Sequence, residues 1–174
     1  IDGVDITVGT TTNQDGSTTS TVVIPVINAG RQDQVGEVTV ADIPLVKSSG
    51  GAPLLLAQLP TGFGLQVSGS GPKAAASSQL DLVREVAAHG DAGAQASIGA
   101  GIASFVQGLA PATPVLVQTV VPTAAGGAAA PAGPLTLTGT PAAAGNPATA
   151  LVIDARGLAT GTSIQLENVE FAAL

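Results

Sequence analysis

Short runs of alternating apolar and polar residues, each closed by glycine or proline, recur along this chain and favour a fold built from β-strands. Residues 1–12 begin the pattern, with Val4, Ile6 and Val8 on one side. A turn over 13–16 follows, since its Asp-Gly pair suits a positive φ angle. Further strands are predicted over 18–27, 37–43, 53–59, 64–68, 115–121, 135–138, 151–154 and 163–171.

Two details refine this strand pattern. Pro25 removes a donor from its strand, which favours an edge or bulged position. Strands 53–59 and 64–68 are separated by Leu-Pro-Thr-Gly, a sequence that suits the turn of a hairpin. The hairpin residues LPTGFGLQV resemble LATGTSIQL at 158–166, so the chain has either two turns of like chemistry or a diverged duplication on facing sheets.

One region has the period of helices. Ser77 and Ser78 are natural N-caps, and Asp81 follows Ser78 by three residues. The first helix is predicted to bury the face that carries Leu80, Val83 and Ala87, and to stop at Gly90. The second carries an apolar stripe at Ile98, Ile102, Phe105, Val106 and Leu109.

Glycine and proline mark the inside and the end of this helical region. Gly99 and Gly101 weaken the second helix but let a neighbouring backbone approach closely. Pro111 and Pro114 end it.

These elements predict a single, mainly β domain over 1–174. The fold class is a sandwich or barrel-like arrangement of antiparallel sheets with a short helical insert at 78–109. The Ala, Gly and Pro-rich segment 122–150 reads as a linker or low-complexity stretch. The core is expected to contain Val4, Ile6, Val38, Val40, Leu65, Val67, Ile98, Ile102, Phe105, Val117, Ile153, Leu166 and Phe171.

The composition excludes several classes of protein. The chain has no cysteine, which excludes a disulfide scaffold, a zinc site with thiolate ligands and a thiol enzyme. A net charge of −7, with five Lys and Arg residues, argues against binding nucleic acid or anionic membranes. No apolar stretch is long enough to span a membrane. The chain begins at Ile1 without Met, which indicates a processed product or an excised segment.

His89 is the only histidine, and Asp154 and Arg156 form the most notable charged pair. His89 falls at the predicted end of a helix, where a cation complements the helix dipole, so a capping role is favoured over acid–base catalysis. Asp154 and Arg156 flank Ala155 and are expected to form a local ion pair.

The remaining candidates for chemistry are scattered. Glu167 and Glu170 offer carboxylates, but a sugar site also needs aromatic platforms, and the chain has only three Phe. Phe105 and Phe171 are expected in the core. Asp2 with Asp5, or Asp15 with nearby carbonyls, could hold calcium loosely, but no EF-hand loop is present. We therefore expect no catalytic residue, no metal site and no cofactor.

The C-terminal segment 150–174, ALVIDARGLATGTSIQLENVEFAAL, resembles a module of large secreted bacterial proteins of the hemolysin-type calcium-binding (RTX) group. There, a similar strand–turn–strand ends in an Asn-Val-Glu-Phe-Ala run. The fragments IPVINAGRQD at 24–33 and ADIPLV at 41–46 resemble the upstream part of that region. The resemblance implies type I secretion and a surface or matrix location. The calcium repeats of the group are absent here, so it implies no calcium ligand.

Two functions from different classes are compatible with these observations. The first is a non-enzymatic extracellular structural module that self-associates in a bacterial surface layer, filament or matrix. The alternative is an adhesion domain that binds a glycan or a protein, and a hydrolase domain ranks third. Self-association is expected because few charges keep copies apart, and because strand 1–12 could be donated to a neighbouring sheet. Otherwise that strand pairs within its own sheet in a monomer.

Overall fold

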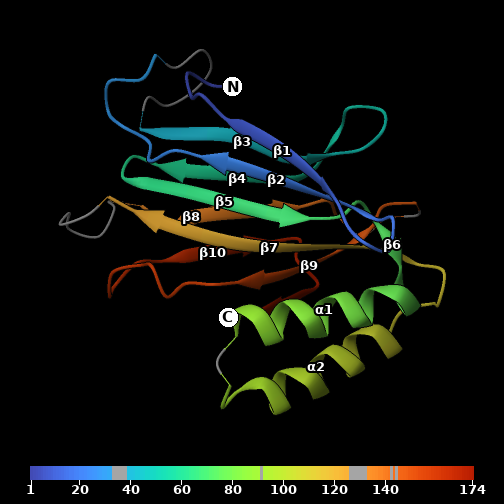
Figure 1. Ribbon diagram of the computed structural model, residues 1–174. Coiled ribbons are helices and arrows are strands. Elements are labelled where there is room, and N and C mark those ends of the chain that lie inside the picture. Colours follow the sequence, from blue (N-terminus) through green and yellow to red (C-terminus); the bar gives the residue numbers. More distant parts are fainter. Residues whose placement is uncertain (33–38, 91, 126–132, 142, 144) are drawn as a thin grey trace.

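Two β-sheets packed face to face form the centre of the molecule, and two helices lie against the outer side of the larger sheet (Figure 1). The computed structural model describes residues 1–32, 39–90, 92–125, 133–141, 143 and 145–174. The predicted β-sandwich with a helical insert is therefore confirmed.

The larger sheet has the strand order β1-β2-β5-β7-β9-β11, with β6 beside β7. The smaller sheet has the order β10-β8-β4-β3. The strands of the larger sheet are β1 (Thr7–Thr12), β2 (Thr18–Ile24), β5 (Phe63–Gly69), β6 (Lys73–Ala74), β7 (Pro114–Ala124), β9 (Ala148–Ile153) and β11 (Phe171–Ala173). Those of the smaller sheet are β3 (Val40–Lys47), β4 (Pro53–Pro60), β8 (Leu135–Gly139) and β10 (Ile164–Glu167).

The sheets are mixed, although the sequence pattern predicts antiparallel sheets. β9 runs parallel to both β7 and β11, and β10 runs parallel to β8. The cause is the path of the chain, which passes from one sheet to the other after each strand from β7 onward. Each crossing reverses the direction of the chain, so every second strand returns to its first sheet in the original direction.

The predicted hairpin of 53–59 with 64–68 is wrong, because its strands belong to different sheets. β4 pairs with β3 and β8, whereas β5 pairs with β2 and β7. The short turn between them carries the chain across the sandwich. Its Thr61 N–H donates to the Thr39 carbonyl at 2.9 Å, and Gly62 adopts a φ of 96°. The predicted turn is present, but a tight turn can lead to a facing sheet as well as to a neighbouring strand.

The related segment 158–166 is also a crossing rather than a hairpin. It leads from β9 in the larger sheet to β10 in the smaller one, the opposite direction to the β4–β5 turn. Gly161 has a φ of 89°, close to that of Gly62. Both segments therefore use a Thr-Gly turn to change sheets.

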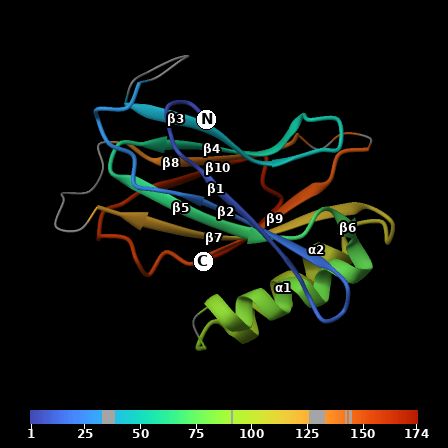
Figure 2. The same ribbon diagram turned by 45° about the horizontal axis from the view of Figure 1, so that its top comes forward.

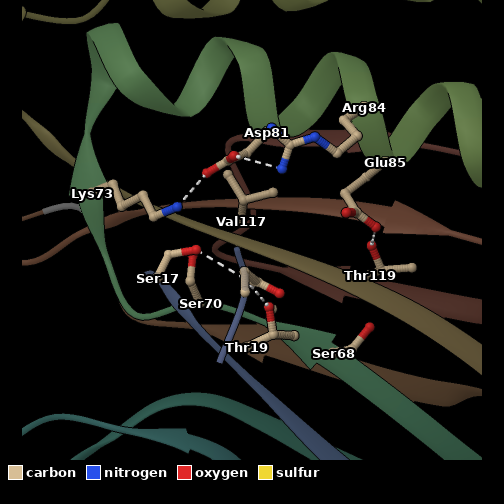
Figure 3. Close-up of a pocket in the computed structure, with 12 residues that line it drawn as sticks. Ser17, Thr19, Ser68, Ser70, Lys73, Asp81, Arg84, Glu85, Val117 and Thr119 are labelled. Atoms are coloured by element: carbon tan, nitrogen blue, oxygen red, sulfur yellow. Dashed lines mark hydrogen bonds and ion pairs between the residues drawn. The ribbon is translucent and has the colours of Figure 1, made fainter. Parts of the chain in front are cut away.

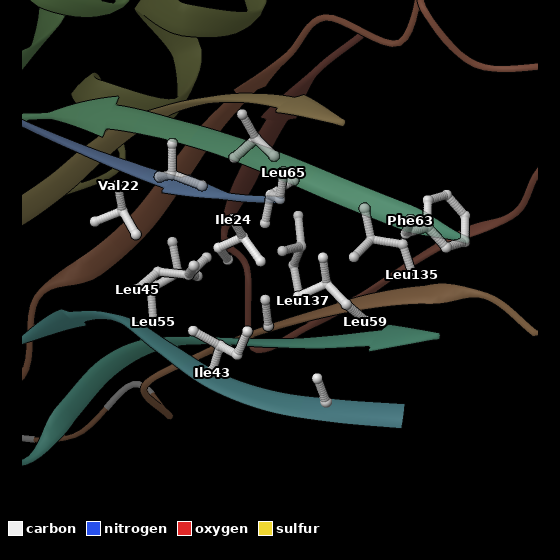
Figure 4. Packing of buried hydrophobic residues seen from close by; sticks show 14 of the residues in the cluster. Val22, Ile24, Ile43, Leu45, Leu55, Leu59, Phe63, Leu65, Leu135 and Leu137 are labelled. Carbon is white, nitrogen blue, oxygen red and sulfur yellow. The ribbon is translucent and has the colours of Figure 1, made fainter. Parts of the chain in front are cut away.

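Two apolar clusters hold the three layers together. The first fills the space between the sheets (Figure 4), and its largest fully buried side chains include Ile43, Leu55, Phe63, Leu65 and Leu137. The second lies between the helices and the outer face of the larger sheet. Leu82, Val86 and Ile102 from the helices meet strands β7 and β9 there. β7 contributes to both clusters because its alternate side chains point to opposite faces.

The predicted core is confirmed for the residues that the structure describes. None of them is exposed, and Val38 lies outside the described residues. Val4, Leu65, Val67, Ile102, Val117 and Ile153 are buried, and Ile6, Val40, Ile98, Phe105, Leu166 and Phe171 are half-buried.

The first helix, α1 (Ala75–His89), turns a different face to the sheet from the one predicted. Its buried residues are Ala75, Ser78, Leu82 and Val86, whereas the predicted face is exposed. Neither Ser77 nor Ser78 is an N-cap, because the helix begins at Ala75, with Ala74 at the cap position. The Ser78 hydroxyl donates to the Ala74 carbonyl at 3.1 Å, within the helix. The predicted stop at Gly90 is correct.

The second helix, α2 (Gln95–Gln107), follows its predicted stripe. Ile102 and Val106 are buried, with Ile98, Phe105 and Leu109 packed beside them. The predicted close approach of a backbone to Gly99 and Gly101 is wrong. A Cβ on Gly101 would lie 3.6 Å from the Phe171 side chain, which is ordinary contact distance, and a Cβ on Gly99 would meet nothing within 4 Å.

Pro25 and the segment 122–150 differ from expectation. Pro25 follows the last residue of β2, which is an interior strand between β1 and β5, so the predicted edge position is wrong. The segment 122–150 contains β8, and Leu135 and Leu137 of that strand are fully buried between the sheets. The domain itself orders this part of the segment.

Candidate functional site

A polar pocket lies where the β1–β2 hairpin and β5 meet α1 (Figure 3). The hairpin reaches the end of the molecule where β6 leads into α1 (Figures 1 and 2). Hydroxyl groups of Ser17, Thr19 and Ser68 line one side, and charged groups of β6 and α1 line the other. Most of the residues that line it are polar or charged.

The charged groups of this pocket are bonded to one another. Lys73 Nζ lies 2.8 Å from Asp81 Oδ2, and Arg84 Nη1 lies 3.6 Å from Asp81 Oδ1 (Figure 3). Thr119 Oγ1 donates to Glu85 Oε2 at 2.6 Å. These bonds join α1 to β6 and to β7, so the polar groups stabilise the packing of the helix on the sheet.

The space left in the pocket is about 60 Å³. That is far below the roughly 300–1,000 Å³ of sites that enclose small ligands. The pocket admits a few water molecules, and no aromatic side chain lines it. The arrangement supports attachment of the helix to the sheet.

The charged contacts continue along α1 to His89, its last residue. His89 Nδ1 lies 3.5 Å from Asp154 Oδ2, and its Nε2 lies 3.9 Å from Glu85 Oε2. Both ring nitrogens thus face carboxylates. The imidazole connects the end of α1 to the end of β9, at the helix terminus where the sequence predicts it.

The predicted ion pair of Asp154 with Arg156 is confirmed. Arg156 Nη2 lies 2.5 Å from Asp154 Oδ2, and Nε donates to Oδ1 at 2.7 Å. These side-chain bonds, together with the Arg156 backbone N–H and His89, hold the pKa of Asp154 well below its usual value, and they outweigh the opposing effect of burial. Asp154 remains ionised and anchors two cationic or polar neighbours at once.

The other carboxylates are dispersed over the molecule, and each bonds to its own partner. Asp2 pairs with Arg31 at 3.2 Å, and Glu170 accepts the Thr149 backbone N–H at 2.6 Å. Asp15 accepts both the hydroxyl and the backbone N–H of Ser17, which lowers the pKa of its carboxyl. Glu167 is exposed and accepts from Thr138 at 3.3 Å. Among the described residues, no three His, Asp or Glu side chains are grouped to hold a metal ion.

The phenylalanines belong to the packing of the layers. Phe63 is fully buried between the sheets. Phe105 of α2 stacks on Phe171 of β11 with ring centroids 5.3 Å apart. All three side chains are therefore engaged inside the fold, as expected for Phe105 and Phe171.

The edge of the larger sheet at β1 is the most open feature of the fold. All six residues of β1 are exposed, and the strand contains no charge and no proline. Val8 is 65% exposed. Such an edge presents unpaired backbone groups to any other strand that approaches it.

The other sheet edges are protected. β3 carries Pro44 and Lys47, and its register is irregular near Pro44. The Asp42 N–H of this strand donates to the Asp2 carboxylate at 3.0 Å. β10 has four residues and ends in Glu167, and β11 has three. Charges, prolines, bulges and shortness are the usual means of blocking edge pairing, and β1 has none of them.

The free backbone groups of β1 can be identified from its pairing with β2. Asn13 N donates to Ser17 O at 2.8 Å, so the hydrogen-bonded pairs of the hairpin continue at every second residue. Thr7, Gly9 and Thr11 therefore bond to β2. The N–H and C=O groups of Val8, Thr10 and Thr12 point to the open side.

Comparison with known proteins does not assign this chain to a class: no family model, no curated protein and no solved structure matches it. Within the described residues, neither helix has the length and apolar character needed to cross a membrane.

Sequence reasoning singled out strand 1–12, His89, Asp154 and Arg156, but not the charged contacts made by Lys73 and Glu85. The spacing of α1 indicates only the pairs within the helix, since Asp81 and Arg84 are three residues apart and Glu85 and His89 are four. The contacts of Lys73 with Asp81 and of Glu85 with Thr119 join different elements, so no local spacing indicates them.

Proposed function

We propose that this chain is a non-enzymatic structural module that self-associates through the edge of β1. The observation that carries the proposal is the contrast between this open, uncharged edge and the three protected ones. Sheet edges that take part in no interaction are normally blocked. Pairing at this edge uses backbone groups and needs no particular ligand. The same edge on another copy of the chain can therefore serve as the partner.

The edge is suited to pairing with itself. An antiparallel pair of β1 strands from two copies, centred on Thr10, matches each outward N–H with an outward C=O of the partner. Thr10 then lies opposite Thr10, and Val8 lies opposite Thr12. Threonine pairs across strands are favourable, and the absence of charge avoids repulsion between two acidic chains.

Edge pairing also keeps the N-terminal segment in its own domain. Val4 is buried in the core between the sheets, and Ile6 packs against that core. Full donation of 1–12 to another copy would remove those contacts and the whole β1–β2 ladder. Pairing at the edge adds hydrogen bonds without this loss, so we favour it over strand donation.

The setting that we propose is extracellular: a bacterial surface layer, filament or matrix, reached by secretion. Support comes from the acidic composition without cysteine or methionine and from the resemblance of 150–174 to secreted RTX-type proteins. An adhesion domain for a glycan or protein is the alternative. The polar pocket beside α1 is too small for that role.

The test replaces Thr10 with proline. Pro removes one outward N–H at the centre of the edge and leaves the bonds of Thr7, Gly9 and Thr11 to β2 in place. The residue before it is Gly9, which has no side chain to clash with the proline ring. We expect Thr10→Pro to weaken self-association by at least about tenfold, measured by light scattering after size exclusion across a concentration series.

Thr10→Val is the matched control, because it keeps the N–H and the β-branched shape. It should associate as the parent chain does, and both variants should show the thermal unfolding of a folded domain. Equal association of Thr10→Pro and Thr10→Val would overturn the proposal, as would a parent chain that stays at 16.7 kDa up to millimolar concentration.

A further inference from the structure

The outer face of α1 carries an apolar stripe that nothing in the chain covers within the described residues. Leu80 is 70% exposed and Val83 is 46% exposed. Ala76 and Ala87 extend the stripe, because they lie four residues before Leu80 and four after Val83 on the same helix face. Large exposed apolar side chains grouped in this way commonly mark an interaction site.

A hollow of about 300 Å³ lies beside this stripe, between α1 and α2. Val83, Ala87, Ala96, Gly99 and Ile102 contribute to its walls, and none of its lining residues is charged. A Cβ placed on Gly99 would meet no atom within 4 Å. The groove is therefore apolar, open and shaped by small residues.

Few charged groups reach this face of the helix pair. The chain carries a net charge of −7, but α2 has no charged residue at all. On α1, Asp81 and Glu85 turn toward β6 and β7, where they bond to Lys73 and Thr119. Arg84 is the one strongly exposed charged side chain on either helix. Two copies of an acidic chain repel each other least where their facing surfaces carry no acid.

We propose that a second copy of the chain docks on this face about a two-fold axis, with Leu80 of each copy seated in the groove of the other. Leu80 precedes Val83 and Ala87 by about 5 and 10 Å along the helix, at about 1.5 Å per residue. Antiparallel packing of the two α1 helices therefore sets each Leu80 over the partner's groove. The stripe supplies both the projecting side chain and the hollow, as a self-complementary contact requires.

This inference rests on the proposed function and extends it. The β1 edge and the helix face lie on different elements, and each forms a two-fold contact. A chain with two different two-fold contacts assembles beyond the dimer, with edge contacts and helix contacts alternating. The orientation of the two axes decides whether this assembly closes as a dihedral oligomer or continues as a filament.

The test blocks one contact at a time with a substitution, so that the other contact can be measured alone. Thr10→Pro blocks the edge, so the inference expects this variant to form a dimer through the helices. Leu80→Glu places acid in the apolar groove of an acidic partner, and it should form a dimer through β1. The parent chain should form longer species, and the double variant should be a monomer. Val26→Ser, at an exposed apolar residue outside the helices, is the matched control and should behave as the parent does.

Cross-linking gives a second readout, because it reports which residues meet across the contact. If Leu80 meets the turn of Ala87 in the partner, the two-fold axis passes close to Val83. The chain has no cysteine, so Val83→Cys in the Thr10→Pro background should form an intermolecular disulfide on mild oxidation. Val26→Cys in the same background should not.

The outcomes separate this inference from the proposed function. Dimers of Leu80→Glu with monomers of Thr10→Pro would overturn the helix contact and leave the β1 edge in place. Dimers of Thr10→Pro that persist with Leu80→Glu, or fail to cross-link through Val83→Cys, would also overturn it. Binding of monomeric Thr10→Pro to phosphatidylcholine vesicles would show that the face meets lipid rather than a second copy.

Discussion

Gly139, at the end of β8, shows how closely backbones approach in this sandwich. A Cβ at this position would lie 2.3 Å from the Asn168 carbonyl oxygen and 2.6 Å from Thr149 Oγ1. Neither neighbour can move easily, because the first is backbone and the second belongs to a fully buried residue. We expect Gly139→Ala to lower the free energy of unfolding by about 1–3 kcal/mol, as overpacking does elsewhere. Urea unfolding measures the change.

The matched control is Gly71→Ala, because a Cβ there meets nothing within 4 Å. It should be neutral or slightly stabilising, since alanine restricts the unfolded chain. Equal stability of the two variants would contradict the close packing around Gly139.

Asp154 makes the stability of the protein depend on pH. Its pKa is lower in the folded state than in the unfolded chain, because Arg156 and His89 bond to the carboxylate. The stabilisation is therefore complete above the unfolded-state pKa of about 3.9, and it is lost as the pH falls through the folded value. We expect Asp154→Asn to lower the unfolding free energy by about 1 kcal/mol at pH 7, with the difference shrinking below about pH 4.

Glu167→Gln is the comparison, since Glu167 is exposed and makes one long hydrogen bond. It should follow the parent at every pH. A gap between the parent and Asp154→Asn that stays constant from pH 7 to pH 2.5 would contradict the role of the carboxylate charge.

At the scale of the element, α1 carries apolar residues on two faces, and only one of them is buried. Leu82 is fully buried against the sheet, whereas Leu80 is 70% exposed. Leu82→Ala should lower the unfolding free energy by about 3 kcal/mol, while Leu80→Ala should change it by no more than about 0.5 kcal/mol. Thermal or urea unfolding at a concentration where the chain is monomeric measures both. The reverse order would show that the helix is rotated as the sequence pattern predicts.

The failure of the helix prediction has a local cause. Leu80, Val83 and Ala87 form as good an apolar stripe as Ala75, Ser78, Leu82 and Val86, and the second contains a serine. Ser78 tolerates burial because its hydroxyl donates to the carbonyl four residues earlier, which periodicity does not reveal. In α2 the periodicity predicts the buried face correctly, because the large apolar residues of this helix lie on one side only.

At the scale of the whole molecule, the path of the chain between sheets matters more than the strands themselves. From β7 onward the chain changes sheet after every strand, so neighbours in space are rarely neighbours in sequence. In the observed strand order, β1 is the only long, uncharged edge among the described strands. The helix pair lies on the outer face of the larger sheet, away from β3 and β4 (Figure 1). The two proposed contacts therefore depend on the order of the strands and on the placement of the helices.

The sequence by itself determined most of the strands, where the helices lie, and most of the core, because alternation and helical period are local properties of burial. It also identified the pair of Asp154 with Arg156, which lie two residues apart. It did not separate β10 from β11, which lie in different sheets but were predicted as one strand over 163–171. Only the tertiary structure decided which sheet each strand joins, which face of α1 is buried, and which edge stays open. Those choices depend on contacts between residues far apart in the chain, such as β7 with β9 and Glu85 with Thr119, and no local pattern encodes such pairings.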